Sequence, residues 1–144
     1  MKAMGLDVGD KTIGIAISDD LLMIANGHST LDRIGIRKDT GKILELIKNN
    51  NCNIVIIGLP LNLDGSDSLQ TKKVREFAAA LENKLRSNSM QNVEVIFQDE
   101  RFTTAIAEKV LIVADVSRKK RKTVIDKQAA VIILQSYLDS AKTN

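Results

Sequence analysis

One short segment constrains the fold more than any other part of this 144-residue chain. Residues 54–57 read Ile-Val-Ile-Ile, with no polar residue among them. An unbroken apolar run of this length is typical of a strand that is covered on both faces, as central strands of parallel sheets are. Gly58 and Pro60 then end the run. The sequence therefore predicts an α/β fold with helices on both faces of a sheet.

The segments around that strand give the order of the other elements. Apolar residues alternate with other residues over 4–8 and 13–17, which predicts a hairpin, and a weaker pattern over 23–29 predicts a third strand. Periodicity predicts a strand over 93–97 and helices over about 34–49, around 74–85, after Thr103 and Thr104, and over about 124–141. This order predicts a single domain over 1–144, with a mixed sheet whose first three strands are antiparallel and whose continuation is parallel.

Cysteine and histidine are too scarce for several kinds of chemistry. Cys52 is the only cysteine and His28 the only histidine. A lone cysteine forms no internal disulfide, which favours a reducing compartment. Asp7 interrupts the N-terminal segment before a long apolar run, which argues against a signal peptide or a spanning helix. We therefore expect a cytoplasmic protein without a membrane partner, and no zinc site built from several imidazoles.

Positive charge is concentrated in one run, although the net charge is only +3. The run consists of five consecutive cations, Arg118, Lys119, Lys120, Arg121 and Lys122. Such a block stays solvated and often contacts a polyanion, but a solvated loop without a partner explains it equally well. Three Phe and one Tyr are too few for an aromatic surface that stacks on nucleic acid bases. We expect any nucleic acid to be recognised through its phosphates and its shape.

Carboxylates occur where strands are predicted to end. Alternation places Asp7 on the face opposite its apolar neighbours, and Gly5 and Gly9 leave open space around it. Asp99 and Glu100 follow the strand at 93–97, the end at which α/β sheets place ligands. Because neighbouring side chains point to opposite faces, only one of this pair can join a given site, and spacing does not decide which. A turn at Asp7 and a solvated acidic pair at 99–100 are the plain alternatives.

Asp126 begins the apolar face of the last predicted helix, which continues through Ala129, Ala130 and Ile133. A buried acid is costly unless it is paired, bound to a metal or placed at a helix end. The dipole of a helix starting near residue 124 would stabilise it, whereas a metal site would also explain its orientation. The acids at these three places would form an oxygen cluster suited to Mg²⁺ or Mn²⁺. A pair of such ions activates water and stabilises the leaving oxygen in phosphodiester hydrolysis.

Five motifs follow one another over nearly the whole chain. They are DVGDKTIGIA at 7–16, GLPLNLDGS at 58–66, VREF at 74–77, DERFTTAIAE at 99–108 and IDKQAAVIILQSYL at 125–138. In this order and spacing they resemble the YqgF family, also called RuvX or the pre-16S rRNA nuclease family. Thr12 stands where the family commonly has Arg, and Asp67 with Ser68 replaces a more glycine-containing stretch. Both departures concern substrate contacts rather than the acids.

The resemblance implies an RNase H-like fold and a metal-dependent endonuclease that trims the 5′ end of the 16S ribosomal RNA precursor. Holliday junction resolution is the older proposal for the family. By matching position, the expected catalytic and metal-binding residues are Asp7, Glu100 and Asp126, with Mg²⁺ or Mn²⁺ as cofactor, and Asp99 remains a possible contributor. The residues expected to bind the phosphates of pre-16S rRNA or branched DNA are Lys11, Arg101, Arg118, Lys119, Lys120, Arg121 and Lys122.

Two hypotheses from other functional classes remain open. Residues 7–14 also match the Asp-x-Gly-x-x-x-x-Gly pattern of sugar-kinase and actin-like ATP-binding folds. Those folds need two such domains, and at 144 residues we expect the second to be missing unless another chain supplies it. A non-catalytic RNA-binding factor for ribosome assembly could use the same basic run. The chain could act as a monomer or as a homodimer, and a symmetric junction would call for a two-fold dimer.

Overall fold

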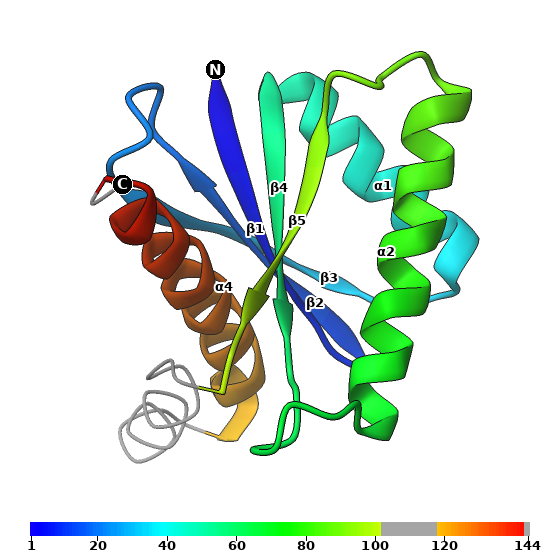
Figure 1. Cartoon of the computed structure of the whole chain (residues 1–144), viewed down its shortest axis with the longest axis vertical. Coiled ribbons are helices and arrows are strands. Elements are labelled where there is room, and N and C mark those ends of the chain that lie inside the picture. Colours follow the sequence, from blue (N-terminus) through cyan, green and yellow to red (C-terminus); the bar gives the residue numbers. More distant parts are fainter. Residues whose placement is uncertain (102–117, 143–144) are drawn as a thin grey trace.

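The structure is a computed structural model that describes the backbone of residues 1–101 and 118–142 and the side chains of 1–101 and 127–141. Its elements are β1 (Lys2–Val8), β2 (Thr12–Ser18), β3 (Ala25–Asp32), α1 (Ile36–Asn49), β4 (Cys52–Leu59), α2 (Leu69–Ser87), β5 (Glu94–Asp99) and α4 (Arg118–Lys142). The strands form one sheet in the order β3-β2-β1-β4-β5 (Figure 1). β1 is antiparallel to β2 and β2 to β3, whereas β4 is parallel to β1 and β5 to β4. The predicted mixed sheet is confirmed.

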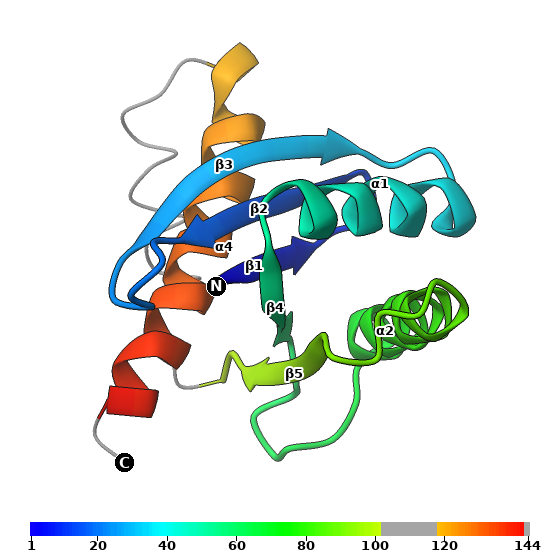
Figure 2. The ribbon, with the colours of Figure 1, turned by 90° about the horizontal axis from the view of Figure 1, so that it is seen from above.

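The apolar run at 54–57 lies in β4, between β1 and β5. Val55, Ile56 and Ile57 are fully buried, because helices cover both faces of this strand. Figure 2 shows the sheet between two layers, with α1 and α2 on one side and α4 on the other. Alternation along each strand therefore sends successive side chains to different helices.

Glycine lets α4 approach the sheet closely. A Cβ atom on Gly5 of β1 would lie 2.7 Å from the Cβ of Leu134 and 2.9 Å from the carbonyl oxygen of Ala130. A Cβ on Gly27 of β3 would meet the side chain of Lys127 at 2.8 Å. The helix backbone thus rests almost directly on the strands, and its position relative to β1 is tightly defined.

Several predicted boundaries move in the structure. The third strand is Ala25–Asp32 rather than 23–29, and the strand expected at 93–97 is Glu94–Asp99. The last helix begins at Arg118 rather than near 124, so the interpretation of the basic run as a loop is wrong. Arg and Lys are good helix formers, and α4 extends backwards through them. The helix expected after Thr103 lies outside the described residues.

Within the part of the chain that the structure describes, no helix is both long enough and apolar enough to cross a membrane.

Candidate functional site

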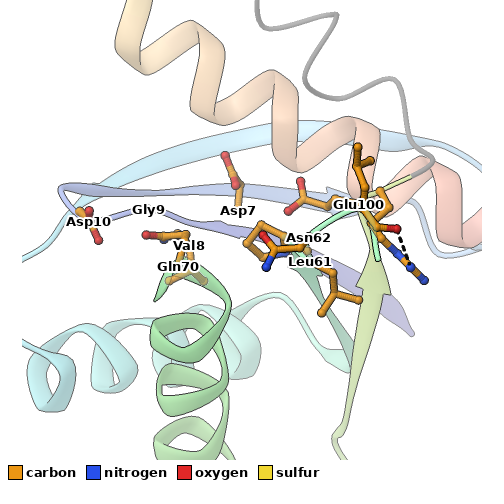
Figure 3. A pocket seen from close by; sticks show the side chains of 12 residues that line it. Asp7, Val8, Gly9, Asp10, Leu61, Asn62, Gln70 and Glu100 are labelled. Atoms are coloured by element: carbon orange, nitrogen blue, oxygen red, sulfur yellow. Dashed lines mark hydrogen bonds between the residues drawn. The ribbon is translucent and has the colours of Figure 1, made fainter. Parts of the chain in front are cut away.

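The carboxyl ends of β1, β4 and β5 meet at one edge of the sheet, because these three strands are parallel. A pocket of about 610 Å³ opens there (Figure 3). It is lined by Asp7, Val8, Gly9, Asp10, Gly58, Pro60, Leu61, Asn62, Leu63, Gln70, Glu100 and Arg101. This is the place at which α/β sheets bind ligands.

Two carboxylates reach this pocket from different strands. Asp7 is half-buried near the end of β1, where alternation puts it on the same face as Ala3 and Gly5, which face α4. Glu100 follows β5 directly and is 8% exposed. Its backbone N–H donates to the carbonyl oxygen of Leu59 at 3.1 Å, which fixes the chain where it leaves the sheet. Figure 3 shows the side chains of Asp7 and Glu100 extending toward the same space.

Gly58 lies in β4 between the strands that carry the two acids. A Cβ atom on it would lie 3.0 Å from the Cδ of Glu100, 3.1 Å from its Oε2 and 2.5 Å from the Cδ1 of Ile133. The missing side chain therefore provides the room in which the carboxylate of Glu100 lies. Sequence reasoning interpreted Gly58 only as the end of a strand, since nothing in a single sequence reports a close approach from another strand.

The structure separates Asp99 from Glu100. Asp99 accepts hydrogen bonds from Arg101 Nε at 2.9 Å, from Nη2 at 2.8 Å and from its backbone N–H at 2.9 Å. The side-chain bonds from Arg101, followed by the backbone bond, hold the pKa of Asp99 below its usual value despite some desolvation. Glu100 lines the pocket together with Asp7, and Asp99 does not. Opposite orientation of adjacent residues, expected from strand geometry, is the reason.

The predicted phosphate-binding cations are distributed unevenly. Arg101 lines the pocket, but its guanidinium group is held by Asp99 and lies 3.4 Å from the carbonyl oxygen of Leu63. Lys11 is exposed in the turn between β1 and β2 and does not line the pocket. Residues 118–122 begin α4, and their side chains lie outside the described residues. The structure thus places one of these seven predicted cations at the pocket wall.

Asp126 lies within α4, and its side chain is outside the described part of the structure. No acidic residue stands in the first turn of this helix, so a role for Asp126 in stabilising the helix start does not apply. Its position is one turn before Ala130, whose backbone abuts Gly5 of β1. Gln135, further along α4, contacts Ala25 and Met23 at the β2–β3 turn, which is the end of the sheet where β1 begins. The helix backbone at residue 126 therefore lies toward the opposite end, where β1 carries Asp7.

The carboxylates of Asp7 and Glu100 suit a hard cation such as Mg²⁺ or Mn²⁺, which prefers oxygen ligands. Among the side chains that the structure describes, no group of three or more His, Cys, Asp or Glu is placed to hold a metal ion. The described residues supply two acids of the predicted set, and the third prediction, Asp126, falls on a side chain outside them. The donor chemistry of these two acids fits the predicted cofactor.

A partly buried ion pair supports the turn that follows Asp7. Arg33 donates from Nη1 to the carbonyl oxygen of Gly9 at 2.8 Å and from Nε to Asp39 at 2.8 Å. Burial alone would raise the pKa of Asp39, but hydrogen bonds from Arg33, Ile34 and Gly35 outweigh it and lower the pKa. On the other side, Gln70 of α2 donates to the carbonyl oxygen of Val8 at 3.2 Å. Sequence reasoning missed both contacts, because they join residues far apart in the chain.

Comparison with known proteins gives a consistent family and fold. Residues 1–140 match the family described as RuvX: Holliday junction resolvase. A relative from Caldanaerobacter subterraneus subsp. tengcongensis, named "Putative pre-16S rRNA nuclease", is 49% identical over 145 residues and covers 100% of both chains. A relative of the same name from Syntrophomonas wolfei is 46% identical over 139 residues, covering 96% of this chain and 94% of its own.

Solved structures of low sequence identity share the fold. The RuvC protein of T. thermophilus in complex with a Holliday junction substrate superposes with a TM-score of 0.61 at 13% identity, covering 100% of this chain and 97% of that one. The yeast mitochondrial Holliday junction resolvase Ydc2 has a TM-score of 0.58 at 11% identity, covering 94% and 77%. These similarities show the RNase H-like fold that the sequence motifs implied.

Proposed function

The chain belongs to the RuvX family of nucleases, and we propose that it is a metal-dependent endonuclease whose hydrolytic site is the pocket containing Asp7 and Glu100. One observation carries the proposal: two carboxylates from strands on either side of β4 line one pocket, and Gly58 between them has no side chain to fill it. Family membership supports the reaction, and this geometry supports its location.

We propose Asp7, Glu100 and Asp126 as the residues that hold the metal. Mg²⁺ or Mn²⁺ bound there would activate a water molecule and stabilise the leaving oxygen of the phosphodiester. The backbone hydrogen bond from Glu100 to Leu59 and the space over Gly58 keep one carboxylate in place before substrate arrives. The contacts of Arg33 with Gly9 and of Gln70 with Val8 do the same for the strand end that carries Asp7. Such preorganisation reduces the rearrangement that the reaction requires.

The substrate we propose is the 16S rRNA precursor, cut at its 5′ end. Relatives with high identity over their full length are named "Putative pre-16S rRNA nuclease", which supports the precursor as substrate. Lys11, Arg101 and the cations of 118–122 would bind its phosphates. The alternative substrate is a four-way DNA junction, which the family description and the structural neighbours favour. Both substrates place a phosphodiester in the same pocket.

The test is cleavage of a labelled pre-16S rRNA fragment and of a labelled four-way junction. Wild-type protein with Mn²⁺ should cut the RNA, and Asp7→Asn or EDTA should abolish cutting. Asp20→Asn is the matched control, because Asp20 is exposed in the turn between β2 and β3, outside the pocket. If correctly folded wild type with Mn²⁺ cuts neither substrate, the nuclease proposal fails. RNA binding that survives Asp7→Asn and EDTA, without any cleavage, would instead favour a ribosome-assembly factor.

A further inference from the structure

The loop between β4 and α2 presents an apolar side chain to solvent beside the proposed site. Leu63 is 86% exposed, more than any other large apolar side chain in the described part of the chain. Leu61, Asn62 and Leu63 line the same pocket as Asp7 and Glu100. Single exposed apolar residues are common on proteins. What distinguishes Leu63 is its place at this pocket and the rigidity of the loop that holds it.

Hydrogen bonds within the loop hold it in this form. The backbone N–H of Asn62 donates to the carbonyl oxygen of Ser66, and that of Gly65 to the carbonyl oxygen of Asn62, both at 2.9 Å. Asp64 Oδ1 accepts from the backbone N–H of Ser66 at 2.9 Å and from its hydroxyl at 2.6 Å. Gly65 adopts φ +88°, a conformation that favours glycine. The loop is therefore a closed turn with Leu63 at its tip.

A second contact ties the loop to the strand end that carries Glu100. Arg101, the residue after Glu100, places Nη1 3.4 Å from the carbonyl oxygen of Leu63 and 3.0 Å from the point where a Cβ on Gly65 would lie. Asp99 fixes the same guanidinium group by hydrogen bonds to Nε and Nη2. Arg101 thus links the loop that carries Leu63 to the strand end that carries Glu100, and both residues line the same pocket.

We propose that Leu63 inserts against the face of the nucleobase next to the scissile phosphate and unstacks that base from its neighbour. The inference rests on the proposed nuclease function and adds a contact to it. With a phosphate in the pocket, the adjoining base offers the largest apolar surface within reach of this side chain. Leucine is one of the residues with which nucleic-acid-binding proteins separate stacked bases.

The described residues offer no aromatic side chain for this task at the pocket. Phe77 is fully buried, Phe97 is partly buried against the core beneath α1 and α2, and Tyr137 packs against the cluster beneath α4; none of them lines the pocket. The scarcity of aromatic residues predicts recognition through phosphates and shape, and Leu63 adds an aliphatic contact with a base. An unstacked nucleotide would let the backbone bend into the pocket that holds the two acids.

The experiment compares Leu63→Ser with Leu69→Ser. Leu69 is 79% exposed at the start of α2 but does not line the pocket, so it is a matched control. The probe is a pre-16S rRNA fragment with 2-aminopurine on either side of the cleavage site mapped with wild type. Fluorescence of 2-aminopurine rises when the base is unstacked. Fluorescence is measured with proteins that also carry Asp7→Asn, so that the bound RNA stays intact. Cleavage is measured with proteins that keep Asp7.

We expect fluorescence to rise with the Asp7→Asn protein and with its Leu69→Ser derivative, but not with its Leu63→Ser derivative at equal RNA occupancy. In proteins that keep Asp7, Leu63→Ser should lower kcat/KM by about tenfold, the loss that removal of one modest base contact produces. Leu63→Met should retain the wild-type rate, because it keeps the apolar surface.

Unchanged fluorescence and cleavage in Leu63→Ser would overturn the inference while leaving the nuclease function intact. Slower cleavage with an undiminished fluorescence rise would also overturn it, since Leu63 would then act in some way other than unstacking. Failure of the wild type to cleave would count against the proposed function itself.

Discussion

The two faces of the sheet are built from different residues. On the face covered by α1 and α2, the strands contribute Met, Leu, Ile and Val, which pack with Phe77 and Leu81 into a large core. On the face covered by α4, the strands contribute small residues such as Ala3, Gly5 and Ala16. This second face ends, at the carboxyl edge of the sheet, in Asp7 and Glu100.

The difference separates stability from function. Large side chains on the first face remove much apolar surface from water and hold the sheet together. Small residues on the second face bring α4 to within direct contact of the backbone, so that residues on the helix and on three strands meet at one edge. Acids at that edge contribute little to packing and supply the proposed chemistry. Substitutions on the two faces should therefore have different consequences.

Truncation on the first face should cause the largest loss of stability. Leu81 is fully buried in the core between the sheet and α2. We expect Leu81→Ala to lower the free energy of unfolding by about 2–5 kcal/mol, the range for buried leucine. Cleavage per folded molecule should stay at the wild-type level. Urea denaturation measures the first quantity, and Leu69→Ala on the exposed side of the same helix is the control. A strong loss of activity in folded Leu81→Ala would contradict the claim that one face of the sheet provides stability and the other provides activity.

Removal of an acid from the second face should have the opposite effect. We expect Glu100→Gln to reduce cleavage by at least about a hundredfold, because Glu100 is a proposed metal ligand and a ligand matters at least as much as the groups that orient it. Thermal stability should fall far less than in Leu81→Ala, since glutamine keeps the size and shape of the glutamate side chain. Asp99→Asn, one residue away on the opposite side, should lose less than about tenfold, because a half-exposed ion pair contributes little. Equal losses in the two variants would contradict the assignment of Glu100 to the pocket.

Gly58 offers a way to affect both packing and chemistry from one position. The methyl group of Gly58→Ala would meet Ile133 Cδ1 at 2.5 Å and Glu100 Cδ at 3.0 Å, and the backbone there has no left-handed φ. We expect a loss of about 1–3 kcal/mol in stability from overpacking, together with slower cleavage.

Adding Ile133→Val to Gly58→Ala distinguishes these effects. Valine lacks the Cδ1 atom, so the double variant should recover part of the stability beyond additivity, as a double-mutant cycle would show. Cleavage should remain low, because the new methyl group still displaces the carboxylate of Glu100. Full recovery of cleavage would mean that Gly58 serves only the packing of α4.

Low pH should destabilise the face covered by α1 and α2 through protonation of Asp39, with a smaller effect than the substitutions above. The lowered pKa of Asp39 means that its ionised form stabilises the fold above the unfolded-state pKa, about 3.9. That contribution is lost as the pH falls below about 4 and through the lower folded-state pKa. Denaturation curves of Asp39→Asn should show lower stability at neutral pH and a weaker dependence on acid than wild type. Parallel curves for the two proteins down to low pH would contradict this role.

The sequence was sufficient to predict most of the fold. Burial can be inferred directly from some sequence patterns. The alternation over 4–8 and 13–17 predicts the hairpin, and the apolar run at 54–57 predicts the central strand. The start of α4 could not be predicted in this way, because the basic run at 118–122, which forms its first turns, has no apolar face to mark the helix. The family motifs pointed to RuvX, and the match over residues 1–140 confirms this against the ATP-binding alternative.

The site could be predicted only in part. Strand alternation shows that Asp99 and Glu100 diverge, but the choice between them depends on which face of β5 meets α4, a tertiary contact. Arg101 was predicted as a phosphate ligand, and its hydrogen bonds to Asp99 depend on the bend that follows the strand. The space that Gly58 leaves for Glu100 and the proposed base contact of Leu63 could not be predicted for the same reason. Each depends on residues that are distant in the sequence.

Diffraction from a crystal of the full chain with Mn²⁺, recorded at the manganese absorption edge, tests the central claim most directly. A two-carboxylate pocket predicts anomalous density coordinated by oxygens of Asp7 and Glu100, with Asp126 completing the set from α4. Density that contacts Asp99 instead, or that lies only at acids outside the pocket, would contradict the proposed hydrolytic site.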